Sequence, residues 1–588
     1  MFLLPVPAAR AVLTRTCDPV NAVANTTNVL CAPSSVCNMA SVTFKEDVDI
    51  PSGGCTFDLG GRTLSIQQTL KTSGSGFITV VNAGDITITA TGRLNTRGDN
   101  FSSNKICGGG TNANAPCASN SECPGAICSF LIIGGGLVSL TSTGTITLLN
   151  RAQIDVSGDP AGIIRLIAGG MNVAGVGVDL ETALAEVNGL GISSFTDTGE
   201  RFADGGTLDV TASTGSISDN GTINMPGANQ AMGGAITMRA ARNITVGNLI
   251  DASGGGGDGG DVDLLAGDNI AITRTITVDS RLGGGYGGLI TLAAGQDSIG
   301  GVAVGGTLTV DVTRGPLKLD GSVSETFGGD GGDLDASALG TLQFIGVGTA
   351  VSANAGTTFD GYGGTITLDS SDSNTSVVGP LDGDLIVGNK IVATSGSTAG
   401  DGGLLDATAG RNLILNGDLD LSGKDTGGDV TGVAGGTVSL NGLIDAHATT
   451  ATGVGGYVDF TAGEARGQGD TGLLTVAKDI VASGGTENGS GQTVSLAGCT
   501  LTVNGGVKIN GSAGTNAAGT LGGSDIELIA RRPMHLMASS QYLATPGGSI
   551  TLTYPPGQAP VIGAGVVFNP ARIDNATTGA FFPNCPVC

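Results

Sequence analysis

The sequence lacks the bulky side chains from which an ordinary globular core of its length is built. Its 588 residues contain no Trp, 5 Tyr and 15 Phe, whereas Gly occurs 105 times. Gly therefore exceeds twice its average share of about 7%. A disordered chain is disfavoured nonetheless, because 40% of the residues are apolar and they recur at regular spacing. Collagen is excluded because the Gly residues follow no three-residue period.

Basic residues are scarce as well. Lys and Arg total 26 against 51 Asp and Glu, so the formal net charge is −25, and it is spread along the chain. Because nucleic acids and anionic lipids are bound by clustered Lys and Arg, we expect no nucleic-acid partner and no lipid-docking surface. The sequence has no run of eighteen apolar residues, and we expect no membrane span.

Groups suited to catalysis are few. The two histidines, His447 and His535, stand far from every cysteine in the sequence and support no Ser-His-Asp or Cys-His group. The Gly-rich stretches are not phosphate-binding loops, because no Gly-Lys-Ser/Thr follows them. We therefore predict no catalytic residue and no cofactor, apart from the calcium pattern described below.

Eleven cysteines indicate where the protein folds. All but Cys499 fall into three groups in loop-like sequence, which predicts local disulfides and an oxidising, extracellular compartment. Zinc is the alternative, and only the Cys-x-x-Cys pair at 585–588 has ligand-like spacing. An odd count leaves one thiol for a bond between molecules. The disulfide candidates are Cys17, Cys31, Cys37, Cys55, Cys107, Cys117, Cys123, Cys128, Cys585 and Cys588.

An internal repeat explains the composition. Gly-Gly pairs followed by alternating apolar residues recur from Gly205 to Gly547, and four units, beginning at Gly233, Gly259, Gly402 and Gly427, align without gaps. Apolar residues occupy offsets 3, 5, 7, 11, 13, 17 and 19 from the first Gly, and 27 of these 28 positions are aliphatic or Ala. The exception is Gly432.

These offsets predict three short strands per unit, each with one side facing inward. Gly and Asn at the intervening corners, such as Gly267-Asp268-Asn269 and Asn416-Gly417-Asp418, are expected to supply the positive φ of tight turns. Three strands and three corners make one coil of an all-β, right-handed parallel β-helix, or β-solenoid. Ladders of aliphatic side chains fill such a narrow interior, and aromatic residues are not needed.

The solenoid is expected to span residues 61–555. Residues 1–60 form a cysteine-containing N-terminal cap or tail, and residues 556–588 form a C-terminal cap or tail. Two segments interrupt the coils: a cysteine-rich insert at 99–130 and a loop or short helix near 171–204. Within the second segment, the stretch from Asp179 to Leu190 has a helical sequence pattern.

Units such as Gly233-Gly-Ala-Ile-Thr-Met-Arg-Ala-Ala-Arg-Asn-Ile-Thr-Val resemble the repeats of filamentous-haemagglutinin-type right-handed parallel β-helix proteins. The resemblance is architectural and covers residues 130–555. It implies a secreted, bacterial, surface-exposed rod. No Asn-Pro-Asn-type motif of that family's secretion domain occurs near the N-terminus, which leaves the export route open.

Parallel β-helices also include pectin lyases and polygalacturonases, so a polysaccharide-acting enzyme is an alternative. Glycoside hydrolysis needs two carboxylates about 5–10 Å apart, and outward-facing pairs such as Asp261 with Asp263 are candidates. Neither a Gly-His-Gly nor an Arg-Ile-Lys motif of polygalacturonases occurs. An enzyme is therefore the less favoured interpretation.

Two nearly identical stretches match part of the Gly-Gly-x-Gly-x-Asp calcium pattern, and they place Asp258, Asp261, Asp330 and Asp333 at coil corners. In calcium β-rolls this unit repeats in tandem, whereas each copy here is solitary. A tight Gly turn with an exposed Asp is the favoured interpretation, with Ca²⁺ as the alternative.

The sequence therefore predicts a secreted or cell-surface structural and adhesive solenoid without catalytic activity. Its expected partners are cell-surface or matrix components, or copies of itself joined end to end in an extracellular filament.

Overall fold

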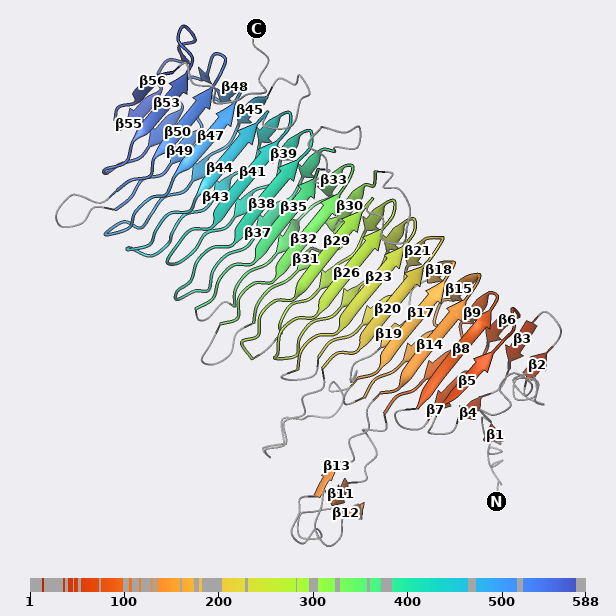
Figure 1. Cartoon of the computed structure of the whole chain (residues 1–588). Coiled ribbons are helices and arrows are strands. Elements are labelled where there is room, and N and C mark those ends of the chain that lie inside the picture. Colours follow the sequence, from red (N-terminus) through yellow and green to blue (C-terminus); the bar gives the residue numbers. More distant parts are fainter. Residues whose placement is uncertain are drawn as a thin grey trace, which may run out of the picture. The chain divides into compact units, whose positions relative to one another are not determined.

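The chain is built from stacked coils of three short strands, and within each unit successive coils pair strand by strand in parallel (Figure 1). In this computed structural model the described residues are 13–14, 35–37, 41–45, 47–50, 54–72, 76–98, 105–107, 116–117, 128–130, 135–158, 161–173, 179–181, 204–227, 231–281, 283–295, 305–322, 328–356, 360–371, 383–463, 472–514 and 522–577. The predicted parallel β-helix is confirmed.

The chain divides into two units. The first comprises Met1–Thr196, Gly206–Ser213 and Asn220–Met225. The second comprises Asp197–Gly205, Thr214–Asp219 and Pro226–Cys588. Each coil contributes one strand to each of three sheets. We number the sheets 1, 2 and 3 in the order in which their strands follow each Gly-Gly pair.

In the first unit, all three sheets are parallel from the first coil onward. Sheet 1 contains β5 (Cys55–Asp58), β8 (Phe77–Ala83), β14 (Leu137–Ser142), β17 (Ile163–Ala168) and β20 (Thr207–Ala212). Sheet 2 contains β3 (Ser41–Phe44), β6 (Thr63–Ile66), β9 (Ile86–Ile88), β15 (Thr145–Leu148) and β18 (Gly170–Val173). Sheet 3 contains β4 (Val48–Ile50), β7 (Thr69–Thr72), β10 (Arg93–Asn95), β16 (Gln153–Asp155), β19 (Asp179–Glu181) and β22 (Thr222–Asn224).

Two short strands pair with the first coil of this unit. β1 (Leu13–Thr14) lies parallel to β4, and β2 (Ser35–Cys37) lies antiparallel to β3. The cysteine-rich insert has a sheet of its own, in which β11 (Lys105–Cys107) pairs antiparallel with both β12 (Pro116–Cys117) and β13 (Cys128–Phe130).

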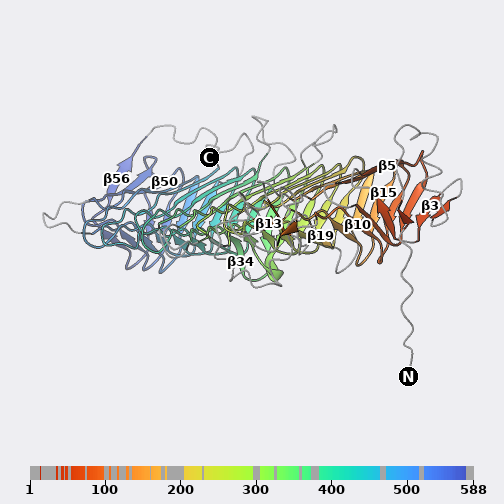
Figure 2. The ribbon, with the colours of Figure 1, turned by 90° about the horizontal axis from the view of Figure 1, so that it is seen from below.

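In the second unit the same order repeats over more coils, from β21 to β56, and Figure 2 shows β56 at the C-terminal end of this unit. Sheet 1 contains β23 (Ala235–Ala240), β26 (Asp261–Ala266), β29 (Leu289–Ala294), β32 (Asp333–Ala338), β35 (Thr365–Ser370), β38 (Leu404–Ala409), β41 (Asp429–Ala434), β44 (Val458–Ala462), β47 (Val494–Gly498), β50 (Ile526–Ala530), β53 (Ile550–Tyr554) and β56 (Ile573–Ala576). Sheet 2 contains β21 (Ile217–Asp219), β24 (Ile244–Val246), β27 (Ile270–Ile272), β30 (Leu308–Asp311), β33 (Leu342–Ile345), β36 (Leu385–Val387), β39 (Leu413–Leu415), β42 (Val438–Leu440), β45 (Leu473–Val476), β48 (Thr500–Val503), β51 (His535–Leu536) and β54 (Val561–Ile562).

Sheet 3 of the second unit has the shortest strands, and a 3-10 turn, η4 (Val312–Arg314), precedes one of them. Its strands are β25 (Ile250–Asp251), β28 (Ile276–Thr277), β31 (Leu317–Lys318), β34 (Thr349–Ser352), β37 (Lys390–Val392), β40 (Leu419–Asp420), β43 (Ile444–Asp445), β46 (Ile480–Val481), β49 (Lys508–Asn510), β52 (Gln541–Leu543) and β55 (Val567–Asn569).

The interior is the predicted aliphatic ladder. All 28 inward positions of the four aligned units are buried. Register partners of adjacent coils stack one on the next: Ile236 is paired with Val262, and Val262 with Ile290. Adjacent strands lie about 4.8 Å apart, so each layer of side chains packs directly on its neighbour.

The Gly-Gly pairs are required by close packing of backbone. A Cβ on Gly259 would lie 1.7 Å from the carbonyl oxygen of Val278, and one on Gly402 would lie 1.8 Å from that of Leu421. Positive φ occurs at some corners, as at Gly295 and Gly506, but the expectation is wrong for the corners named above, because φ is not positive at Gly267, Asn269 or Gly417. Corner Gly residues instead admit the backbone of the preceding coil, with 1.9 Å separating a Cβ on Gly417 from the Asn389 carbonyl oxygen.

Asn has a different role at the corners. The Asn269 side-chain amide donates to Asn243 Oδ1 across 3.0 Å, and the Thr307 amide donates in turn to Asn269 Oδ1. Corner Asn residues therefore link one coil to the next.

Other expectations also need correction. The helix expected over 179–190 does not form at its start, because Asp179–Glu181 is strand β19, parallel to β16 and β22. Leu180 stands in register between Ile154 and Ile223, where a coil requires an apolar residue, and sheet pairing overrides helix propensity. Residues 182–190 lie outside the described part of the chain.

Coil pairing also extends beyond the range expected for the solenoid. It begins at Ser41, within the expected N-terminal cap, and continues to Ala576, within the expected C-terminal cap. At that end the inward position above Leu552 is occupied by Asp574, which forms an ion pair with Arg572. The Arg572 guanidinium lies 5.3 Å from the centroid of the Phe568 ring, which stacks on Tyr542. Aromatic and charged groups thus cover the last core layers.

Candidate functional site

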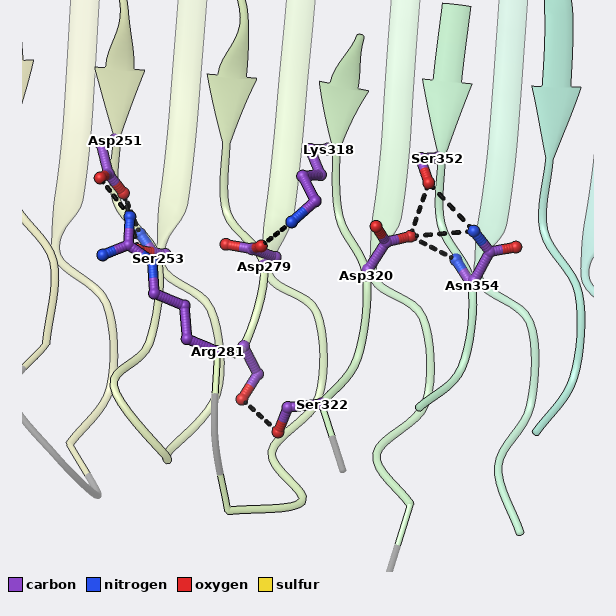
Figure 3. Close-up of polar contacts among 10 residues, drawn as sticks. Asp251, Ser253, Asp279, Arg281, Lys318, Asp320, Ser322, Ser352 and Asn354 are labelled. Atoms are coloured by element: carbon purple, nitrogen blue, oxygen red, sulfur yellow. Dashed lines mark hydrogen bonds and ion pairs between the residues drawn. The ribbon is translucent and has the colours of Figure 1, made fainter. Parts of the chain in front are cut away.

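Polar side chains gather at one corner of the second unit, where sheet 3 turns towards sheet 1 (Figure 3). Asp251, Asp279 and Asp320 come from three successive coils, and the side chains of the first two are almost fully buried. Ser253 and Ser322 are buried beside them. A group of buried acids and hydroxyls is the pattern from which an active site could be made, so the partners of each group decide its role.

Two of these acids form ion pairs with cations of the following coil. The Arg281 guanidinium contacts the Asp251 carboxylate, and the Lys318 ammonium contacts that of Asp279 (Figure 3). The Ser253 hydroxyl also donates to Asp251 Oδ1 across 2.7 Å. Both pairs join adjacent coils.

The third acid begins a hydrogen-bonded chain. Asp320 Oδ1 accepts hydrogen bonds from the Ser352 hydroxyl at 2.7 Å and from the Asn354 side-chain amide at 3.1 Å (Figure 3). Asn354 Oδ1 then accepts from the Thr394 hydroxyl at 2.8 Å. The chain therefore crosses three coils.

The same corner continues along later coils with different residues. Burial would raise the pKa of Asp420, but hydrogen bonds from Lys390 and Ser422 lower it below its usual value. One coil on, His447 Nδ1 lies 2.5 Å from Asp445 Oδ1, and this hydrogen bond raises the pKa of the histidine. The Lys390–Asp420 pair thus joins two coils, whereas Asp445 and His447 pair within one coil.

The calcium candidates separate into two kinds. Asp258 Oδ1 accepts the Tyr286 amide at 2.9 Å, and Asp330 Oδ1 accepts the Tyr362 amide at 2.8 Å, so both acids anchor the next coil. Asp261 and Asp333 begin strands β26 and β32 with exposed side chains, and Asp333 Oδ1 also accepts the Thr365 amide of the next coil at 3.2 Å. In the described ranges no three His, Cys, Asp or Glu side chains are placed to hold a metal ion together.

Asp261 belongs to an outward column on sheet 1 that is rich in acids. Burial and the neighbouring Asp263 carboxylate raise the pKa of Asp261. Burial also raises the pKa of Asp369, with the carboxylates of Asp335 and Asp406 adding to the effect and hydrogen bonds from Ser371 opposing it. Acids on this face therefore repel one another both within a strand, as Asp261 and Asp263 do, and across neighbouring strands, as Asp369 does with Asp335 and Asp406.

The middle outward column of sheet 1 alternates hydroxyl and carboxylate side chains from strand to strand. In register order its members are Thr237, Asp263, Thr291, Asp335, Thr367, Asp406, Thr431, Asp459, Ser495, Glu527 and Thr551. The Thr431 hydroxyl donates to Asp406 at 3.0 Å. Interposed hydroxyls keep successive acids about 9.6 Å apart, two strand spacings, which limits their repulsion.

Two of the cysteines have described side chains. Cys55 and Cys499 are buried and disulfide-bonded. Cys37, Cys107, Cys117 and Cys128 lie on strands β2, β11, β12 and β13, of which only the backbone is described. Cys17, Cys31, Cys123, Cys585 and Cys588 lie outside the described residues.

The polar side chains at the corner between sheets 3 and 1 were not predicted from the sequence, although the sequence contains a signal for them. In the four gapless units, offsets 18 and 20 are polar in every case, as in Asp251 with Ser253 and Asp420 with Ser422.

Comparisons of the chain with protein-family models, curated proteins and solved structures find no match. Among the described residues no helix is long and apolar enough to span a membrane.

Proposed function

We propose that the protein is a non-catalytic structural and adhesive β-solenoid, secreted or displayed at the cell surface. The observation that carries this proposal is the use of the polar corner residues. Asp251, Asp279, Asp320 and His447, which could act as acids or bases, each contact a neighbour on the same or the adjacent coil. Groups whose ion pairs and hydrogen bonds are used in this way stabilise the stacked coils.

The compartment is inferred from the cysteines. Two buried cysteines, Cys55 and Cys499, are disulfide-bonded, and such bonds persist in oxidising environments outside the cytosol. The architecture agrees with that of filamentous-haemagglutinin-type proteins, whose repeats these units resemble.

Protease treatment of intact cells that produce the protein tests the proposal. We expect peptides of the second unit to be released without lysis, while a cytosolic marker stays intact. Release only after lysis would contradict an exposed location.

A second candidate function, assembly into an end-to-end filament, is favoured by the last coil. Val561, Val567 and Ile573 are each about half exposed on β54, β55 and β56. Within the described part of the chain these strands pair on one side only, and open strand edges are templates for further pairing. Negative-stain microscopy distinguishes separate particles from long fibres, and loss of fibres on deleting 575–588 would locate the joint.

A further inference from the structure

The residues that precede six successive Gly-Gly pairs, from Gly205 to Gly363, form a row in which the large side chains are exposed and Asp258 and Asp330 are half-buried. Backbone hydrogen bonds fix its order: Gly259 donates to the Tyr286 carbonyl, Gly287 to that of Asp330 and Gly331 to that of Tyr362. The row, which we call the tyrosine strip, is Asp204, Met232, Asp258, Tyr286, Asp330 and Tyr362. Carboxylates and large apolar groups therefore alternate from coil to coil.

The large members of the strip are strongly exposed. Met232, Tyr286 and Tyr362 have 50%, 54% and 55% of their surface accessible. Each follows the previous one by two coils, a separation of about 9.6 Å. Large exposed apolar side chains in a regular row are characteristic of a binding surface rather than of scattered surface residues.

The acids of the strip hold the backbone at each large residue. Asp204 Oδ1 accepts the Met232 amide at 3.0 Å, and Asp258 and Asp330 do the same for Tyr286 and Tyr362. Each bond uses Oδ1, and within the described part of the chain the second oxygens of Asp258 and Asp330 accept no hydrogen bond, so they can accept one from a ligand. The backbone of each tyrosine is thus held by a carboxylate of the preceding coil.

The adjoining face of sheet 1 also presents carboxylates, and these alternate with hydroxyl groups. Thr237, Asp263, Thr291 and Asp335 alternate on sheet 1 beside the strip, and Leu289 at the start of β29 is also exposed. Among the described outward positions of β23, β26, β29, β32 and β35, Arg239 is the one cation. A face with many carboxylates and one cation repels anionic ligands.

We propose that the tyrosine strip binds a neutral, extended polysaccharide whose alternate sugars present the same face, with β-1,4-linked glucan as its simplest form. Aromatic rings cover the apolar faces of sugar rings, and carboxylate oxygens accept hydrogen bonds from hydroxyls. A chain that repeats every two sugars meets one ring of the strip per repeat. The proposal rests on the proposed adhesive function and names its ligand class.

Tyrosine emission provides a direct readout because the protein contains no Trp and 5 Tyr. The purified full chain is titrated with cellohexaose, which reaches both rings, and with cellobiose, which reaches one. Pull-downs on microcrystalline cellulose and on polygalacturonate follow. We expect saturable binding of cellohexaose, affinity for cellobiose weaker by about tenfold, retention on cellulose and none on polygalacturonate.

Matched variants localise the site. Tyr286→Ala with Tyr362→Ala should weaken cellohexaose binding by about tenfold, whereas Phe at both positions should retain most of the affinity. Val347→Ala removes an exposed apolar side chain away from the strip and should leave binding unchanged. Absence of cellohexaose and cellulose binding, equal binding by the double Ala variant, or preference for polygalacturonate would overturn the proposal. Release of peptides from intact cells is independent of these results, so failure here leaves the surface location standing.

Discussion

Gly432 and Phe460 are register partners on adjacent strands of sheet 1, and the Gly makes room for the ring. A Cβ on Gly432 would lie 2.3 Å from Cδ1 and Cε1 of Phe460. The single inward position of the aligned units without an aliphatic side chain is thus filled from the next coil.

Gly432→Ala should therefore destabilise the protein by about 1–3 kcal/mol, as overpacking of a full core does. Chemical denaturation followed by circular dichroism measures this change. Gly522→Ala is the control, because a Cβ there meets no atom of the described residues within 4 Å. Phe460→Leu in the Gly432→Ala background should recover part of the loss, and an unchanged loss would show that the ring is not the cause.

Lys318→Met leaves the buried Asp279 carboxylate without its cation. The free energy of unfolding should fall by about 1–3 kcal/mol, below the cost of breaking a fully buried pair, because Lys318 is partly exposed. Lys478→Met, at an exposed position, should have no measurable effect. If both variants unfold at the same denaturant concentration as the parent, the corner ion pairs do not hold the coils together.

His447 should make stability depend on pH. Since its folded-state pKa is raised by Asp445, its contribution is fully present below its unfolded pKa of about 6.5. The contribution is lost as pH rises through the folded pKa. The parent should exceed His447→Gln in stability at pH 5.5 by up to about 1 kcal/mol, and the difference should shrink by pH 9. A difference that grows with pH would reverse the assignment.

The insert should contain a disulfide between Cys107 and Cys128. These residues are register partners in the antiparallel pair of β11 and β13. Opposed Cα atoms in such pairs lie about 4.5–5.5 Å apart, within the range that a disulfide spans. Peptide mapping without reduction should recover this link. A peptide joining Cys107 to Cys117 or to Cys123 would show that the register does not set the pairing.

The solenoid and its interior could be predicted from the sequence because the inward positions repeat without gaps in units such as those at Gly233 and Gly402. The reason for the corner Gly residues could not, since steric exclusion by the preceding coil appears only after stacking. The limits of the solenoid were also predicted too narrowly. Coils near both ends, such as those that include β8 and β56, form without a Gly-Gly pair at their start.

The surface patterns were hidden for another reason. Loops of different length separate the units, so register partners such as Asp263, Thr291 and Asp335 occur at irregular intervals along the chain. The alternation of Tyr286, Asp330 and Tyr362 likewise emerges only when backbone hydrogen bonds place them on consecutive coils. The candidate calcium motif was visible, but the coil-to-coil role of Asp258 and Asp330 was not.

Product analysis separates a non-catalytic solenoid from a polysaccharide-acting enzyme. The purified full chain is incubated with polygalacturonate, cellulose and cellohexaose, with and without added Ca²⁺, and the soluble products are analysed by mass spectrometry. A structural and adhesive protein should leave every polymer and oligosaccharide intact, including the fraction that it binds. Shortened or unsaturated oligosaccharides that increase with protein concentration would contradict it.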